Sequence, residues 1–211
     1  RLCPRNCSID RTGGKIGFCG ESSTIKAALA SVHNWEEPPI SGTKGSGTIF
    51  FTGCNLKCVF CQNYSISSEH SGKEISVERL SEIMLEQQAR DVHNINLVTA
   101  VHFVPSVIKA VEKARQNGLT IPIVYNSSGY EKADTIKMLE GTVDIYLPDI
   151  KYFSSKLSAK YSSAPDYFEY ASAAVKEMHR QCENVIFDEN RIMQKGIIIR
   201  HLILPSCKTD S

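Results

Sequence analysis

Three cysteines within eight residues constrain this chain more than any other feature of its sequence. Cys54, Cys58 and Cys61 are spaced C-x3-C-x2-C and follow Gly53 and a short β-branched and aromatic segment, 48–51. That position predicts a loop at the carboxyl end of a strand. Thiolates are soft ligands that suit iron–sulfur clusters and zinc. In a [4Fe–4S] cluster, three local cysteines leave one iron open to bind another ligand.

Two other interpretations of the triad are open. Structural zinc normally has four protein ligands, so a zinc site here would need a fourth, with His70 or a distant cysteine as candidates. The cysteines would otherwise be small buried hydrophobes, which fits poorly with the polar Asn55 and Lys57 between them. A disulfide within the triad would close a very small loop and stabilise little. The motif therefore favours a cluster, with zinc as the alternative metal.

Strand-like and helix-like segments alternate after the motif. Strands are expected at 48–51, 95–99, 121–125, 143–147 and 196–204, and helices at 76–84, 105–117, 131–140 and 167–182, with 154–163 as a loop or short helix. This alternation predicts right-handed crossovers and a parallel sheet. Five strands and four helices are too few for a complete eight-fold barrel. We expect an α/β fold of the partial (β/α)6 parallel-barrel type, shortened at its C-terminus.

The first 46 residues differ from the rest and are expected to form a Cys-rich N-terminal segment, with the barrel at 47–211. The only helix expected in this segment lies near residues 25–32. Cys3, Cys7 and Cys19 are bordered by Pro and Gly residues that would let the chain wrap a metal. They form a candidate second site for zinc or an auxiliary iron–sulfur cluster, with free thiols as the weaker alternative.

Charge and hydropathy indicate a soluble, cytoplasmic chain. Twenty-four Lys and Arg balance 23 Asp and Glu, so the net charge of +1 gives no indication of nucleic acid as a partner. The most apolar stretch, 197–204, is interrupted by Arg200 and His201, well short of the ~20 apolar residues that span a bilayer. The N-terminus lacks the apolar core of a signal peptide. Cys182 and Cys207, both isolated, are expected to be ordinary residues.

Several words of the sequence outside the triad are distinctive as well. They are LCPRNC at 2–7, GFCG at 17–20, WEEPPISG at 35–42, GCNL at 53–56 and CQNY at 61–64. Together with the triad they resemble the radical S-adenosylmethionine (SAM) superfamily, and within it the uncharacterised relatives of the pyruvate formate-lyase activating enzymes. The resemblance covers essentially all 211 residues.

This resemblance implies an enzyme in which the open iron of a [4Fe–4S] cluster binds the amino and carboxylate groups of SAM. One electron, from a flavodoxin- or ferredoxin-type reductant, would break SAM into methionine and a 5′-deoxyadenosyl radical that takes hydrogen from a substrate. No catalytic residue beyond the cluster and SAM is implied. The target would be a glycine in a partner enzyme, a small molecule or an RNA. The alternative is a metal-binding structural or interaction protein without catalysis.

The resemblance also implies SAM contacts at the ends of successive strands. These are Thr99 and His102 after the second strand, Asn126 after the third, Asp149 and Lys151 after the fourth, and Arg200 within the fifth. Lys151 would meet the SAM carboxylate, or Asp149 would help to hold a cation. Arg200 and His201 put charge into an apolar strand, where it needs a partner. Because successive strand residues alternate in direction, only one of the two is expected to face the interior.

Overall fold

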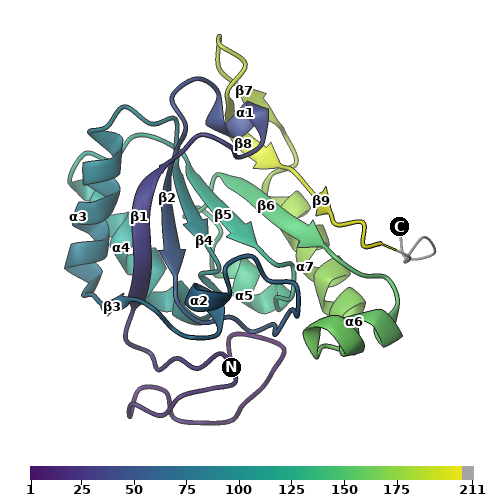
Figure 1. The fold of residues 1–211 in the computed structure, drawn as a ribbon. Coiled ribbons are helices and arrows are strands. Elements are labelled where there is room, and N and C mark those ends of the chain that lie inside the picture. Colours follow the sequence, from purple (N-terminus) through teal and green to yellow (C-terminus); the bar gives the residue numbers. More distant parts are fainter. Residues whose placement is uncertain (206–211) are drawn as a thin grey trace.

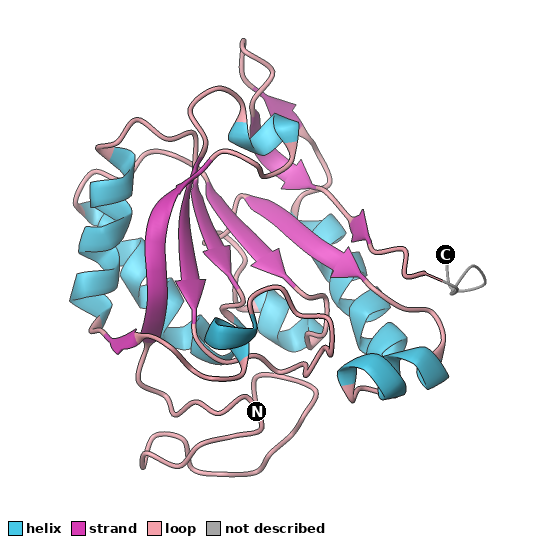
Figure 2. Ribbon diagram, viewed as in Figure 1, coloured by secondary structure: helices cyan, strands magenta, loops and turns pink. Residues whose placement is uncertain are grey.

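The computed structural model describes residues 1–205, in which one open, mostly parallel sheet carries helices on one face (Figures 1 and 2). This is a mixed α/β architecture consistent with a partial TIM-like barrel. The central parallel strands lie in the order β2, β4, β5, β6, β8, which are Ser46–Phe51, Ile95–Val98, Ile123–Ser127, Ile145–Ile150 and Met193–Ile197. The strands β2, β4, β5 and β6 overlap the segments in which the sequence predicts strands.

Antiparallel strands that the sequence does not reveal extend the sheet at both edges. They are β1 (Lys26–His33), β3 (Lys73–Glu74) and β7 (Ile186–Phe187). The prediction of a helix near 25–32 is therefore wrong. The segment instead pairs with β2 along its length, from Ala27 opposite Phe51 to His33 opposite Ser46. Strand pairing with the rest of the chain overrides the helical preference of its alanines.

The strand expected at 196–204 is divided in two. After β8, the short β9 (Arg200–His201) also runs parallel to β6, with Arg200 opposite Asp149. Both pieces lie alongside the same neighbour, β8 at the start of β6 and β9 at its end. This arrangement carries Arg200 to the carboxyl end of the sheet.

Four helices cover one face of the described sheet, and the others lie at its ends. The covering helices are α3 (Val77–Gln88), α4 (Val104–Gln116), α5 (Ala133–Lys137) and α7 (Tyr167–Gln181), and the others are α1 (Pro38–Ser41), α2 (Tyr64–Ser67), η1 (Val101–Phe103) and α6 (Ser155–Ser162). Ser76 is the N-cap of α3, since its hydroxyl accepts from the Arg79 amide at 3.0 Å. The helix expected at 131–140 is shorter, because Glu131 turns its side chain inward to Ser127.

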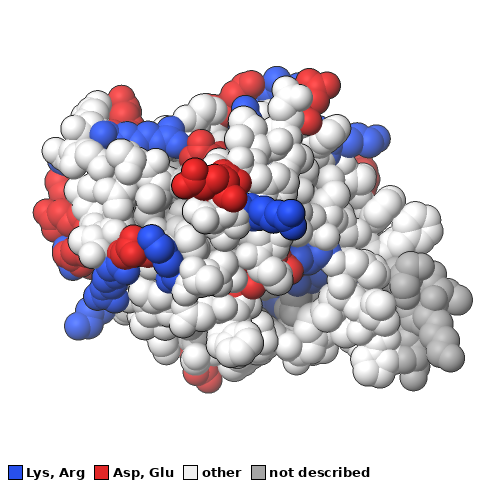
Figure 3. Space-filling model, turned by 90° about the horizontal axis from the view of Figure 1, so that it is seen from above, with Lys and Arg blue, Asp and Glu red and all other residues white. Residues whose placement is uncertain are grey.

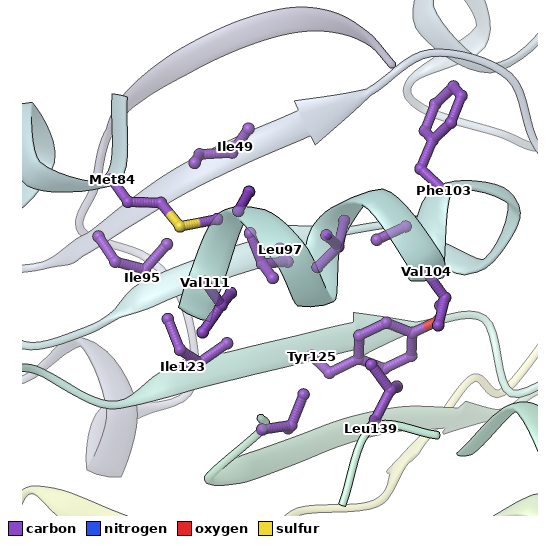
Figure 4. Close-up of a cluster of buried hydrophobic side chains, with 14 of the residues drawn as sticks. Ile49, Met84, Ile95, Leu97, Phe103, Val104, Val111, Ile123, Tyr125 and Leu139 are labelled. Atoms are coloured by element: carbon purple, nitrogen blue, oxygen red, sulfur yellow. The ribbon is translucent and has the colours of Figure 1, made fainter. Parts of the chain in front are cut away.

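The main core lies between the sheet and these helices. Figure 4 shows Val104 and Val111 of α4 against Leu97 of β4 and Ile123 of β5. All four side chains are buried, and each stabilises the fold by about 1.5–3 kcal/mol on burial. This packing makes the sheet a rigid platform, so that side chains on its opposite face and at its carboxyl edge have fixed positions.

The N-terminal segment, residues 1–25, passes beneath the carboxyl ends of the parallel strands (Figure 1). Arg5 fastens it there, with Nε donating to the Asn55 carbonyl at 2.8 Å and its terminal nitrogens donating to the carbonyls of Ser162 and Ser163. The Arg5 guanidinium also stacks on the Phe18 ring at 3.9 Å. One side chain thus joins the N-terminus, the cysteine loop and α6.

The surface of the described residues carries both signs of charge. On the face seen in Figure 3, basic and acidic side chains are interspersed. No helix formed by residues 1–205 is long and apolar enough to cross a membrane. The isolated Cys182 is buried and its thiol donates to the Asp144 carbonyl, as expected of an ordinary core residue, whereas Cys207 lies outside the described residues.

Candidate functional site

A cavity of about 750 Å³ lies at the carboxyl ends of the parallel strands, where residues that end or follow them form its lining. Its walls come from the cysteine loop, the ends of β2, β4, β5 and β6, the strand β9 and the end of β1. The lining includes His33, Glu36, Phe50, Phe51, Gly53, Cys54, Leu56, Cys58, Phe60, Cys61, Asn63, Ile66, Ser67, Val98, Thr99, Asn126, Ser127, Asp149, Lys151, Arg200, His201 and Leu202. All three cysteines of the triad line this cavity.

The cysteine loop begins at Gly53, where the chain turns sharply after β2. Its φ of +74° is a left-handed conformation that side chains rarely adopt, and a Cβ there would lie 2.6 Å from the Cys19 carbonyl oxygen. Glycine is therefore required at this position. The tight turn directs Cys54 into the cavity immediately after the strand.

Each sulfur of the triad has a hydrogen-bond partner. Cys54 Sγ accepts from the Leu56 amide at 3.3 Å, and Cys58 Sγ accepts from the Ser162 hydroxyl at 2.9 Å. Cys61 Sγ lies 3.3 Å from the Ser67 hydroxyl. Hydrogen bonds to sulfur stabilise negative charge on it, as metal-bound thiolates require. The triad therefore suits an iron–sulfur cluster in its donor atoms and their surroundings.

Burial disfavours negative charge on two sulfurs of the triad. Burial raises the pKa of the Cys54 thiol to about 12, and burial also raises the pKa of Cys58. In both cases negative charge on the neighbouring triad sulfurs acts in the same direction. Three adjacent thiolates are unfavourable without a compensating positive charge, which metal ions supply when they displace the protons.

A charged group lines the same cavity as the cysteines. Arg200 Nε donates to Asp149 Oδ1 at 2.8 Å, and Lys151 Nζ donates to Asp149 Oδ2 at 2.5 Å. A further Arg200 nitrogen donates to Asn126 Oδ1 at 2.7 Å. The structure thus brings together four of the residues expected to contact SAM, from three neighbouring strands. One carboxylate between two cations fixes both cationic side chains toward the cavity.

Tyr167 of α7 holds the backbone beneath this charged group. Its buried hydroxyl accepts from the Lys151 amide at 2.9 Å and lies 2.8 Å and 2.9 Å from the carbonyl oxygens of Ser128 and Asp149. Burial raises its pKa, so the hydroxyl keeps its proton as a donor. Tyr167 therefore ties the end of β5 to the end of β6 and fixes the spacing of the residues they carry.

The two residues expected after the second strand have different positions. Thr99 lines the cavity in a left-handed conformation, φ +60°, and its amide donates to the Asn126 carbonyl at 3.0 Å. His102 is not among the residues that line the cavity. Its ring is buried, with Nε2 2.7 Å from the Thr52 carbonyl oxygen, and burial lowers its pKa to about 4. The structure does not bring His102 to the other expected SAM contacts.

Sequence reasoning missed Glu36, which lies in the loop after β1. Its nearly buried carboxylate is 3.7 Å from Arg200, so this loop closes one end of the cavity. The only signal for it in the sequence is its place in the word WEEPPISG. Arg200 and His201 both line the cavity, Arg200 bonding to the Asp149 carboxylate and the exposed His201 ring lying 2.7 Å from the Ile150 carbonyl oxygen. The expected alternation of their directions stays a prediction.

The N-terminal cysteines gather away from this cavity. A Cβ on Gly17 would lie 3.5 Å from Cys7 Sγ and 3.7 Å from Cys19 Sγ, so both sulfurs border the same glycine. Burial chiefly raises the pKa of Cys3, with Cys19 and Cys7 adding to the effect. The seven cysteines within residues 1–205 are free. A metal at this N-terminal set stays a prediction.

In the described part of the chain, no group of three or more His, Cys, Asp or Glu side chains is arranged to hold a single metal ion. The thiolates of a four-iron cluster bind different irons and so lie farther apart than the ligands of one zinc ion. His70, the candidate fourth zinc ligand, instead pairs through Nδ1 with Glu21 at 2.9 Å. Zinc at the triad stays an alternative prediction.

Comparisons with known proteins agree with the chemistry of the triad. A sequence profile of the radical SAM superfamily matches residues 48–188, from β2 through β7. The uncharacterized protein MJ0674 of Methanocaldococcus jannaschii is 31% identical over 213 residues, covering 97% of this chain and 56% of that protein. The uncharacterized protein MJ0808 of the same organism is 26% identical over 167 residues, covering 71% of this chain and 48% of that protein. The chain thus spans about half the length of the curated relatives it matches.

Proposed function

The chain belongs to the radical SAM superfamily, and on that premise we propose that it binds a [4Fe–4S] cluster at Cys54, Cys58 and Cys61 and cleaves SAM reductively. Superfamily membership implies an enzyme of SAM-dependent radical chemistry. The observation that supports the cluster most directly is the setting of the three sulfurs, which line one cavity and each have a hydrogen-bond partner.

The chain's own residues divide the work at this site. The three cysteines hold three irons and leave the fourth without a protein ligand. When bound, the cluster supplies one electron to the sulfonium of SAM, whose carbon–sulfur bond then breaks. Leu56 and Phe60 line the same cavity and add apolar surface beside the triad.

SAM binds at the charged group formed by Asp149, Lys151 and Arg200 in the same cavity. Lys151 and Arg200 offer positive charge to the SAM carboxylate, and Asp149, held between them, offers negative charge to its amino group or to a bound cation. Thr99 and Asn126 complete this wall with polar side chains. These residues come from the ends of β4, β5, β6 and β9, where parallel sheets carry their ligand sites.

The substrate proposed for hydrogen abstraction is a glycine of a partner enzyme or a small molecule, and the proposed electron donor is of the flavodoxin or ferredoxin type. Both proposals rest on the resemblance to the activating enzymes. To test them, purified flavodoxin with its reductase replaces dithionite in the SAM cleavage assay, and a candidate glycyl-radical enzyme is added. A protein-based radical in the added enzyme, seen by electron paramagnetic resonance (EPR), would support activation.

The decisive experiment compares Cys58→Ala with Cys182→Ala after anaerobic reconstitution. We expect Cys58→Ala to lose the broad visible absorption and most iron and sulfide, together with 5′-deoxyadenosine formation under dithionite. Cys182→Ala, a matched control at a buried cysteine whose thiol donates to the Asp144 carbonyl, retains them. Equal spectra for the two variants would contradict the ligand assignment.

The wild-type protein separates the enzyme from the alternative of a metal-binding structural protein. About four irons per chain with SAM cleavage supports the proposal. Four irons without SAM cleavage in the full-length protein favours the structural alternative. One zinc without acid-labile sulfide overturns the cluster.

A further inference from the structure

The three sulfurs of the triad differ in what bonds to them. The donor to Cys54 is the Leu56 amide, a backbone group of the same loop. The donor to Cys58 is the hydroxyl of Ser162, which lies 104 positions along the chain, on α6. This helix lies beside the carboxyl edge of the sheet (Figure 1). At 2.9 Å it is the shortest of the three contacts and the one that tertiary structure alone creates.

Ser162 is buried and its proton is committed to the sulfur. The Tyr152 hydroxyl lies 2.7 Å from Ser162 Oγ, and both side chains are fully buried. A serine has one proton, so when it donates to Cys58 the Tyr152 hydroxyl donates to the serine. The result is a directed chain from Tyr152 through Ser162 to Cys58, in which each donor polarises the next.

The backbone of Ser162 is also fixed against the cysteine loop. Its carbonyl oxygen accepts from an Arg5 guanidinium nitrogen at 3.2 Å and from the Lys57 amide at 3.5 Å. The Val59 amide donates to the Tyr161 carbonyl at 2.9 Å. These contacts on both sides of Cys58 keep α6 and the loop in register, so the short hydroxyl–sulfur contact is supported rather than incidental.

We infer that Ser162, oriented by Tyr152, is a positioning residue that raises the reduction potential of the cluster at Cys54, Cys58 and Cys61; the inference rests on the proposed function. Reduction adds one electron from a one-electron donor and takes up no proton, so negative charge on the sulfur ligands increases. A hydrogen-bond donor to sulfur then stabilises the reduced state more than the oxidised state. Ser162 thereby eases the electron uptake on which SAM cleavage depends.

The test measures the midpoint potential of the anaerobically reconstituted full chain, by redox titration with dithionite and mediators followed by EPR. Ser162→Ala is expected to lower the equilibrium constant for reduction about tenfold, which is about 59 mV for one electron. Ser162→Thr, which keeps the hydroxyl, restores the wild-type value. The control is Ser158→Ala on the same helix, a buried serine whose hydroxyl bonds to the Ser155 carbonyl at 3.1 Å; it leaves the potential unchanged.

Tyr152→Phe provides an independent arm, because it leaves the serine hydroxyl in place but removes the group that orients it. A smaller fall in potential, of the same sign, is expected. If Ser162→Ala does not retain iron, the midpoint potential of Tyr152→Phe alone decides whether the inference holds. Wild-type potentials in both variants overturn the inference and leave the proposed cluster intact. A wild-type protein that reconstitutes without iron and sulfide overturns both.

Discussion

The buried carboxyl group of Glu131 makes the stability of this protein depend on pH in a predictable direction. Glu131 is buried behind the end of β5, where it accepts from the Ser127 hydroxyl at 2.6 Å and from the Tyr125 hydroxyl at 3.3 Å. Burial raises its pKa from 4.5 to about 7, although the two hydrogen bonds act in the opposite direction. Desolvation of the carboxylate therefore outweighs its partners.

The sign and size of the effect follow from this pKa. Between pH 4.5 and 7 the folded protein holds the Glu131 proton more tightly than the unfolded chain, so the free energy of unfolding falls as pH rises through this window. Each pKa unit corresponds to about 1.4 kcal/mol, so the full loss is about 3 kcal/mol, most of it between pH 5 and pH 8. Glu131→Gln, which cannot ionise, removes this component.

The assay is urea unfolding at pH 5 and pH 8, with every variant in the same anaerobic cluster state. The free energy of unfolding of the wild type should fall between these pH values by about 2–3 kcal/mol more than that of Glu131→Gln. Glu112→Gln, an exposed carboxyl group on α4, is the matched control and keeps the wild-type pH dependence. Parallel curves for the wild type and Glu131→Gln would refute the reasoning.

Three further substitutions test how the site is supported, each by urea unfolding. Gly129→Ala should lower the free energy of unfolding by at least about 2 kcal/mol, because φ is +80° and the new Cβ would lie 2.1 Å from the Asp149 carbonyl oxygen. Wild-type stability in this variant would contradict the close approach. Ser76→Ala should lower the free energy of unfolding by about 1 kcal/mol through loss of the α3 N-cap. An unchanged free energy of unfolding would mean that the cap is not formed. Asp149→Asn should lower the free energy of unfolding by about 1–2 kcal/mol, since Lys151 and Arg200 lose their shared carboxylate. An unchanged free energy would show that these ion pairs contribute nothing to stability.

Local signals in the sequence were enough to predict the parallel part of the sheet and the position of the triad. Short β-branched segments and helical periodicity are properties of neighbouring residues, so they located β2, β4, β5 and β6 and the helices between them. The covalent spacing of Cys54, Cys58 and Cys61 limits how far apart their sulfurs can lie, and Gly53 marked the turn before them. The family resemblance pointed to Asn126, Asp149 and Lys151 at strand ends, and strand ends in a parallel sheet meet at one edge.

The remaining features depend on contacts between residues far apart in the chain. Lys26–His33 became a strand because β2 offered it a pairing edge, against the preference of its alanines. Glu36 reached Arg200 and Ser162 reached Cys58 only when the sheet and α6 packed around one cavity. A side chain's partner at such separations is set by burial and hydrogen-bond satisfaction across the whole fold, and no local pattern encodes it. The sequence by itself thus determined that three cysteines lie together in one loop after β2, and the tertiary structure decided what surrounds their sulfur atoms.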